Sequence, residues 1–192
     1  MTDKRLMRLA VDIDGVLANL VADFVPLMNR RFGCNLTPDD ITQYAFEAVA
    51  GVPTAEMDDF IRSLISTGFY GGLTPVHGAA DALRALRPQA HIHLITSRPA
   101  ELEAETRDWL HRHTIPYDAL TFRRRPHKLR AEDRADVVIE DDLEAALTAA
   151  TLAPRVFLLD YPYNRCAVPL PEACVRVRGW DEVLAYLNAV PT

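Results

Sequence analysis

The sequence contains few cysteines and no long run of apolar residues. Its three cysteines, Cys34, Cys166 and Cys174, are odd in number and form no C-x-x-C pair, so free thiols in a reducing compartment are the simplest interpretation. No segment approaches the roughly 18 apolar residues of a membrane span, and the N-terminal residues lack the apolar core of a secretory signal. These absences predict a cytoplasmic protein and argue against the secreted and membrane classes.

Basic residues are in the minority. The chain of 192 residues has 21 Lys and Arg against 27 Asp and Glu, a net charge of −6 at pH 7. This balance argues against a broad binding surface for a nucleic-acid polymer or an anionic membrane. Because apolar residues make up 49% of the chain and charged residues 25%, the composition is typical of a globular protein with its own core.

The order of the predicted elements indicates an α/β core that is interrupted by a helical insert. An apolar strand over residues 6–11 is followed only by helix signals up to Gly72, beginning with a helix over 20–31. After Gly72, strands and helices alternate, which predicts right-handed crossovers and a parallel sheet. The later strands are predicted at 91–96, 119–122, 137–140, 155–159 and 175–177, and the helices at 79–86, 101–111, 129–134, 144–150 and 181–187.

We therefore predict a Rossmann-like α/β fold, a parallel sheet with helices on both faces, and a small all-helical cap inserted after the first strand. Residues 1–16 and 73–192 form the predicted catalytic core, and residues 17–72 form the predicted cap. In open parallel sheets, ligands bind beyond the carboxyl ends of the strands. The polar residues predicted at or near those ends are Asp12, Asp14, Thr96, Ser97, Lys128, Glu140, Asp141 and Asp142.

The carboxylates in this set need a cation if they lie together. Each like-charge pair about 4 Å apart costs on the order of 4 kcal/mol at an effective dielectric near 20. Oxygen ligands and a phosphate substrate favour Mg²⁺ as that cation. A carboxylate beside Mg²⁺ can act as a nucleophile on phosphorus, giving an aspartyl-phosphate. The Thr96 hydroxyl would then hold phosphate oxygens, and a lysine would supply the remaining positive charge.

Lysine is rare enough for its position to be informative. The chain has nineteen arginines but only two lysines, Lys4 and Lys128. Lys4 lies near the N-terminus, whereas Lys128 lies in the loop before the strand 137–140. Because lysine and arginine are not interchangeable beside phosphate, the retained lysine points to Lys128 as a functional residue.

Four motifs in order resemble the haloacid dehalogenase superfamily. They are Asp-Ile-Asp-Gly-Val-Leu at 12–17, Leu-Ile-Thr-Ser at 94–97, Lys128, and Val-Val-Ile-Glu-Asp-Asp at 137–142. The resemblance implies that Asp12 is the nucleophile and that Asp14 protonates the leaving oxygen and then activates water. It also implies Mg²⁺ bound by the Asp12 carboxylate, the Asp14 backbone carbonyl and Asp141, with Glu140 as a second ligand or directly behind the ligands.

A narrower resemblance is to the 5′(3′)-deoxyribonucleotidase family. It is carried by residues 68–79, the Thr-Ser pair, Tyr-Pro-Tyr-Asn-Arg at 161–165 and Arg-Gly-Trp-Asp at 178–181, and the sequence departs from it mainly over 33–67 and at Arg98. It implies a small phosphorylated metabolite as partner, a nucleoside monophosphate, and suggests a homodimer. We expect Ser97, Arg98 and Phe24 to contact that substrate, with Phe24 stacking on its base or sugar.

Several alternatives stay open at this stage. Thr96 and Ser97 could cap the helix after them, which is compatible with phosphate binding at the same place, and Asp142 fits an acidic helix entry better than a metal ligand. The same core serves sugar-phosphate phosphatases and phosphomutases. A phospho-accepting receiver domain and an idle binding module are the non-enzyme alternatives, although in a receiver the acidic pair does not follow the lysine. The base, the sugar and the 5′ or 3′ position of the phosphate are not determined.

Overall fold

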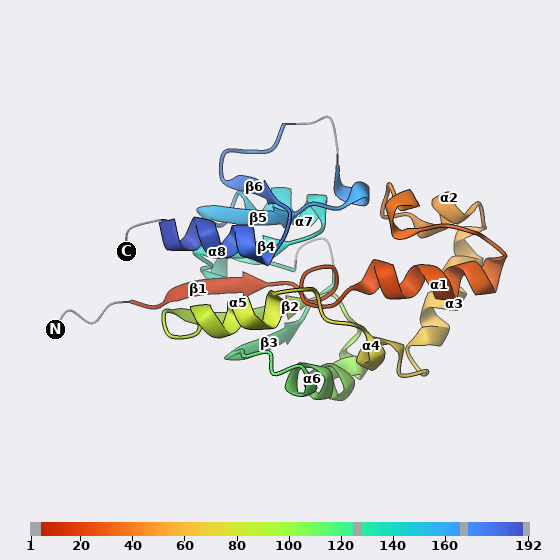
Figure 1. The fold of residues 1–192 in the computed structure, drawn as a ribbon, viewed down its shortest axis with the longest axis horizontal. Coiled ribbons are helices and arrows are strands. Elements are labelled where there is room, and N and C mark those ends of the chain that lie inside the picture. Colours follow the sequence, from red (N-terminus) through yellow and green to blue (C-terminus); the bar gives the residue numbers. More distant parts are fainter. Residues whose placement is uncertain (1–4, 125–127, 166–168, 190–192) are drawn as a thin grey trace.

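The computed structural model describes residues 5–124, 128–165 and 169–189, so Cys166 lies outside the described residues. Its centre is a six-stranded sheet in the order β3-β2-β1-β4-β5-β6 (Figure 1). Every neighbouring pair is parallel. The strands are β1 (Met7–Val11), β2 (Ala90–Thr96), β3 (Ala119–Phe122), β4 (Val137–Glu140), β5 (Arg155–Leu159) and β6 (Cys174–Val177).

Helices cover both faces of the sheet because successive side chains of a strand point to opposite sides. Leu9 and Val11 of β1 pack in one core cluster with α5 (Ala79–Leu86), α6 (Glu103–Arg112) and α8 (Trp180–Ala189). Ala10 belongs to a second cluster on the other face, with α7 (Leu143–Ala149). The Rossmann-like α/β fold is thereby confirmed.

The segment between β1 and α5 is helical, as expected, and has a core of its own. Its helices are α1 (Leu20–Phe32), α2 (Phe46–Ala50), α3 (Thr54–Leu64) and α4 (Phe69–Gly72). Phe24, Met28, Ile41 and Met57 are buried inside this segment. Figure 1 shows α1, α2 and α3 extending from the end of the sheet at which β1 stops. The division into a core and a movable cap at residues 17–72 stays a prediction.

One feature of the helices differs from expectation. The prediction of a helix over 129–134 is wrong, because these residues contain only a single 3-10 turn, Ala131–Asp133. Asp133 accepts hydrogen bonds from the Arg130 backbone and the Arg123 guanidinium, and Arg134 has a positive φ of 48°, so the chain turns instead of continuing as a helix. Among the described helices, none is both long and apolar enough to cross a membrane.

Candidate active site

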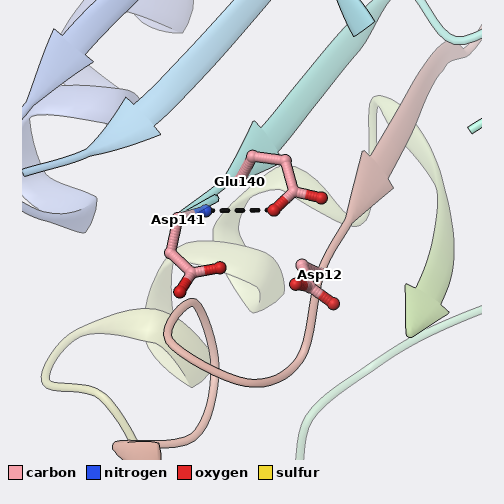
Figure 2. Close-up of side chains that lie close together, drawn as sticks. All are labelled: Asp12, Glu140 and Asp141. Carbon is pink, nitrogen blue, oxygen red and sulfur yellow. Dashed lines mark hydrogen bonds between the residues drawn. The ribbon is translucent and has the colours of Figure 1, made fainter. Parts of the chain in front are cut away.

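Three carboxylates meet where β1 and β4 end. The backbone N–H of Asp12 donates to the carbonyl of Ile139 at 3.1 Å, so the pairing of these strands extends as far as Asp12. Carboxylate oxygens of Asp12, Glu140 and Asp141 all lie within 4.8 Å of one another (Figure 2). The three residues are 8%, 2% and 2% exposed. Water therefore screens their mutual repulsion poorly, and a compensating positive charge is required.

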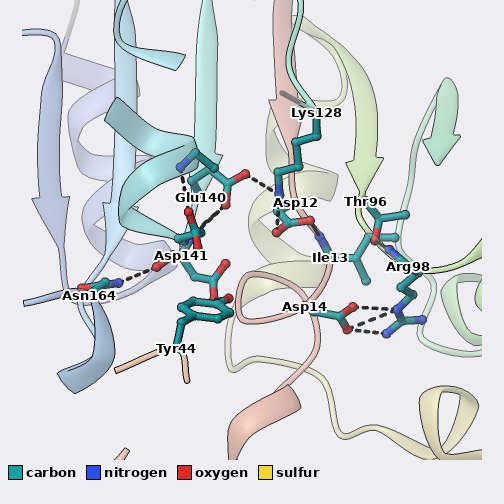
Figure 3. A network of polar contacts seen from close by, with 12 residues as sticks. Asp12, Ile13, Asp14, Tyr44, Thr96, Arg98, Lys128, Glu140, Asp141 and Asn164 are labelled. Carbon is teal, nitrogen blue, oxygen red and sulfur yellow. Dashed lines mark hydrogen bonds and ion pairs between the residues drawn. The ribbon is translucent and has the colours of Figure 1, made fainter. Parts of the chain in front are cut away.

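Lys128 supplies part of that charge. Its Nζ lies 2.5 Å from Asp12 Oδ2 and also pairs with Glu140 Oε1, which places the ammonium between two buried carboxylates (Figure 3). Burial by itself lowers the pKa of Lys128, but attraction to Asp12 and Glu140 outweighs it and raises the pKa above its ordinary value. Lys128 is therefore protonated, yet one ammonium cannot balance three carboxylates.

Asp141 has one oxygen satisfied and one free for a ligand. The hydroxyls of Tyr44 and Tyr163 donate to Oδ2 at 2.8 and 2.7 Å. Oδ1 is buried and has no hydrogen-bond partner among the described residues. A buried acceptor without a partner is costly, and a hard divalent cation satisfies such an oxygen. The carboxylates of Asp12, Asp141 and Glu140 therefore fit Mg²⁺.

The loop after β1 brings its backbone against Asp141. Ile13 O accepts hydrogen bonds from the N–H groups of Leu17 and Ala18, which folds the chain back at Gly15. Gly15 has a φ of +79°, and a Cβ there would lie 2.1 Å from Asp141 Oδ2. This position therefore requires glycine both for its backbone conformation and for its space.

Substituting Gly15 by alanine is expected to displace Asp141. We expect Mg²⁺ affinity to fall at least about tenfold, as when groups that orient a ligand are lost, and the free energy of unfolding to fall by more than about 1 kcal/mol. Titration calorimetry and urea unfolding measure the two effects. Gly51→Ala is the matched control, because Gly51 has a similar φ of +68° with nothing within 4 Å of its Cβ position. Equal Mg²⁺ affinity in both variants would contradict the prediction.

Magnesium binding is expected to compete with protons. Burial, together with repulsion from Asp12, raises the pKa of Asp141 from 3.8 to about 7, and burial also raises the pKa of Asp12 and of Glu140. Below about pH 7 the Asp141 carboxyl must lose a proton before it can bind a cation. Mg²⁺ affinity measured by calorimetry should therefore fall between pH 8 and pH 6, by up to about tenfold per unit.

The same pKa shift predicts how the metal-free protein responds to pH. Because the folded-state pKa of Asp141 lies above its unfolded value, its contribution to stability is complete below the unfolded pKa and is lost as the pH rises through about 7. Asp141→Asn removes the contribution of Asp141 to this pH dependence. In chelator, the variant should melt higher than the wild type at pH 8 and gain less on acidification. A wild-type melting temperature that rises with pH over this range would contradict it.

Asp14 faces away from the carboxylate cluster and pairs with Arg98. The Arg98 guanidinium reaches both Asp14 oxygens, with Nε–Oδ2 at 2.9 Å and Nη2–Oδ1 at 2.7 Å (Figure 3). The Arg98 side chain is 0% exposed and that of Asp14 is 17% exposed. Burial lowers the pKa of Arg98, but attraction to Asp14 outweighs it and leaves the pKa raised. The expected contact of Arg98 with substrate stays a prediction, since its partner here is Asp14.

Thr96 and Ser97 lie at the end of β2, on the side of Asp12 opposite to Glu140 and Asp141. Thr96 is buried, and its Oγ1 accepts a hydrogen bond from the Arg98 backbone at 3.1 Å. Ser97 Oγ is buried without a hydrogen-bond partner in the part of the chain that the structure describes. The arrangement thus leaves one hydroxyl group free to bind an oxygen anion.

A cleft of about 130 Å³ joins these groups. Its lining includes Asp12, Asp14, Ser97, Arg98 and Lys128 from the α/β part, and Tyr44 and Tyr70 from the helical insert. Asp142 also lines it, but its carboxylate accepts a hydrogen bond from Ala145 N at 2.7 Å and caps α7, as the sequence favoured. The sheet edge therefore gathers the residues of all four motifs.

The structure corrects the position expected for Phe24. This residue is 3% exposed and packs against the rings of Phe46, Phe60 and Phe69, at centroid distances of 4.9, 5.7 and 6.4 Å. It is not part of the cleft lining, because its position on α1 turns it into the core of the insert. The cleft aromatics, Tyr44 and Tyr70, were not singled out because no local signal separates them from the other aromatic residues of the insert.

Asn164 was missed as a single residue, although it lies in the Tyr-Pro-Tyr-Asn-Arg segment. Its Nδ2 donates to the backbone carbonyls of Asp141 and Leu159, at 2.7 and 2.6 Å. Tyr163 beside it bonds the Asp141 carboxylate. This segment therefore fixes Asp141 by both its backbone and its side chain, as groups behind the ligands of a cation site do.

Comparison with known proteins identifies related sequences over the whole fold. The model of the family described as 5′ nucleotidase, deoxy (pyrimidine), cytosolic type C protein matches residues 5–190. Nucleotidase CA_C3379 of Clostridium acetobutylicum is 27% identical over 184 residues, 95% of this chain and 94% of the relative. BH1399 of Halalkalibacterium halodurans, whose name also contains the word nucleotidase, is 29% identical over 191 residues, 98% of this chain and 96% of the relative.

Solved structures agree on the fold. The haloacid dehalogenase-like hydrolase SP0104 from Streptococcus pneumoniae aligns with a TM-score of 0.65 at 13% identity, covering 95% of this chain and 98% of that one. A haloacid dehalogenase phosphatase from Thermococcus onnurineus aligns with a TM-score of 0.58, also at 13% identity, covering 97% and 100%. At these identities the likeness establishes the architecture only.

Proposed function

This chain belongs to the family of the 5′ nucleotidase, deoxy (pyrimidine), cytosolic type C proteins and is a phosphatase, and from this premise we propose that it hydrolyses nucleoside monophosphates with the help of Mg²⁺. The observation that carries the proposal is the site itself. Asp12 lies beside two further buried carboxylates and Lys128, and Asp141 keeps one buried oxygen without a partner. Such a set suits the transfer of a phosphoryl group to a carboxylate.

In the proposed reaction, an oxygen of Asp12 attacks phosphorus, and the bond between phosphorus and the leaving oxygen breaks. Asp14 gives its proton to that oxygen, so the nucleoside leaves as an alcohol. Asp14 then takes a proton from a water molecule, whose oxygen attacks phosphorus and releases inorganic phosphate from Asp12. The two steps return both carboxyl groups to their starting states.

The other residues of the cleft would bind and orient the phosphoryl group. Bound Mg²⁺, held by Asp12, Asp141 and Glu140 and by the Asp14 carbonyl, would offset negative charge on the phosphoryl oxygens. Ser97 Oγ has no partner among the described residues and would donate to one of those oxygens, with Thr96 next to it. Lys128, already beside Asp12, would supply positive charge next to the phosphoryl group as negative charge develops on it.

The proposal is tested by phosphate release from a panel of nucleoside 5′- and 3′-monophosphates and sugar phosphates, with Mg²⁺ and with chelator. We expect release that depends on Mg²⁺ and is strongest on deoxypyrimidine monophosphates. Release that is strongest on sugar phosphates would keep the phosphatase chemistry and refute the nucleotide substrate. A stable phosphoprotein that forms without turnover would favour the phospho-accepting receiver.

We also propose that residues 17–72 move as a cap. Drug-sized ligands occupy pockets of about 300–1,000 Å³, whereas the cleft measures about 130 Å³, so a nucleotide needs the Tyr44 side to move away. The hinges would be residues 16–19 and 71–73. Asn19 N donates to the carbonyl of Thr74, the residue directly after the second hinge, at 2.8 Å, so the two connections run close together. Small-angle scattering and proteolysis of the cap should both change when a phosphate analogue is added, and unchanged results would refute the motion.

The proposal extends to location and assembly. The family to which the chain belongs is described as cytosolic, which supports the cytoplasmic location expected from the sequence. The family resemblance supports a homodimer. Analytical ultracentrifugation tests the second point: a single monomer species at all concentrations would refute the dimer.

A further inference from the structure

Arg98 is held on every side by groups of the protein. Its Nη1 donates to Thr106 Oγ1 at 3.2 Å, and its guanidinium carbon lies 5.3 Å from the ring centre of Tyr70 and 5.9 Å from that of Trp109. The fixed guanidinium then reaches both oxygens of Asp14. A planar, bidentate pair of this kind fixes the orientation of the carboxyl group.

Asp14 and Asp12 have different partners, although they are only two residues apart. The oxygens of Asp12 are directed to Lys128 and the backbone N–H of Ile13, whereas Asp14, two residues on, is directed to Arg98. Asp14 and Arg98 both line the cleft. Tyr70 belongs to α4, the last helix of the insert. Arg98 therefore links Asp14 to the segment through which the chain passes from the insert back to the α/β part.

We propose that Arg98 is a positioning residue, which holds the carboxyl group of Asp14 at the cleft so that it can protonate the leaving oxygen of the substrate. This inference rests on the proposed function and deepens it. It differs from the expectation that Arg98 contacts substrate directly. The two roles predict different kinetics, because a positioning residue affects proton transfer and a phosphate ligand affects binding.

The test compares Arg98→Met with the wild type on two substrates. A nucleoside monophosphate has an alkoxide leaving group that needs a proton, whereas p-nitrophenyl phosphate releases a stable anion without one. The ratio kcat/KM reports the steps up to departure of the leaving group. We expect it to fall about 10²-fold for the nucleotide, the lower end of the range for acid–base catalysis, and less than threefold for p-nitrophenyl phosphate.

Three further variants separate positioning from folding. In an Asp14→Asn background, Arg98→Met should cost less than a further threefold, because the group that it positions is already lost. Arg98→Lys should recover part of the nucleotide activity, since lysine restores charge but not the planar fork. Arg112→Met is the matched control, because Arg112 donates to the carbonyl of Gly71 in α4 without contacting Asp14. In this variant kcat/KM should change by the same factor for both substrates. Thermal unfolding establishes that each variant is folded.

Two results would overturn the inference. One is an equal loss of kcat/KM on both substrates, and the other is a tenfold weaker inhibition by inorganic phosphate in Arg98→Met, which would make Arg98 a phosphate ligand. A wild-type protein that hydrolyses p-nitrophenyl phosphate and sugar phosphates but no nucleotide would instead refute the nucleotide substrate. In that case the comparison is repeated with a sugar phosphate, which also has an alkoxide leaving group.

Discussion

Asp12→Asn should lose phosphatase activity almost completely, with kcat lowered at least about 10⁴-fold. The amide has the shape of the carboxylate, but it cannot form the acyl phosphate on which turnover depends. No neighbour can replace it. Glu140 pairs with Lys128, and in Asp141 the Oδ2 atom is engaged by Tyr44 and Tyr163 while the Oδ1 atom would hold Mg²⁺. The fold should survive, because the exchange also removes one of three crowded negative charges.

Two measurements distinguish the loss of a nucleophile from the loss of the site. Acid quenching during turnover, followed by peptide mass spectrometry, should find phosphate on Asp12 in the wild type and nowhere in the variant. Mg²⁺ binding should weaken in the variant but remain measurable through Asp141. Asp136→Asn is the control: Asp136 lies at the opposite end of β4, where it accepts a hydrogen bond from Arg8 N, and its loss should leave kcat unchanged. More than about a hundredth of wild-type activity in Asp12→Asn would rule out a nucleophilic role.

The strand ends explain why so much of the site is readable in the sequence. Three of the four motifs lie at the end of a buried strand, β1, β2 or β4, and the ends of parallel strands meet at one edge of the sheet. Asp12, Thr96 and Glu140 can therefore be placed near one another without knowledge of any side-chain contact. Lys128 is less local, since it lies in a loop, and its rarity in an arginine-rich chain is what singles it out.

The contacts between distant segments could not be predicted in this way. Arg98 and Asp14 are 84 residues apart, and Tyr44 and Asp141 are 97 apart. Neither pair has a local pattern, because the first depends on how the loops after β1 and β2 meet and the second on how the insert packs against the sheet. Phe24 shows the same limit. Helical spacing places it on an apolar face, but only the packing of α1, α2 and α3 decides whether that face meets the cleft or the core of the insert.

Lys128→Met should be the most destabilising change at the site. Lys128 is buried, and it is the cation that Asp12 and Glu140 share. Removing one partner of a buried ion pair leaves an uncompensated charge, which costs about 3–5 kcal/mol. We therefore expect a loss of that order in the free energy of unfolding, measured with urea in chelator at pH 8. Lys128→Arg, which keeps the charge, is the control for packing and should lose less.

The pH and Mg²⁺ dependence of that loss gives its cause. The folded-state pKa of Asp12 and of Glu140 is already raised by burial, and loss of the ammonium raises both further. The deficit should shrink as the pH falls and the carboxyls take up protons, since a raised folded-state pKa stabilises only at lower pH. Mg²⁺ should also restore stability, because it supplies positive charge to the same oxygens, whereas activity should stay at least about 10²-fold low without the lysine. A deficit that neither acid nor Mg²⁺ reduces would mean that Lys128 acts through packing, and the charge balance of the site would then have to be explained without it.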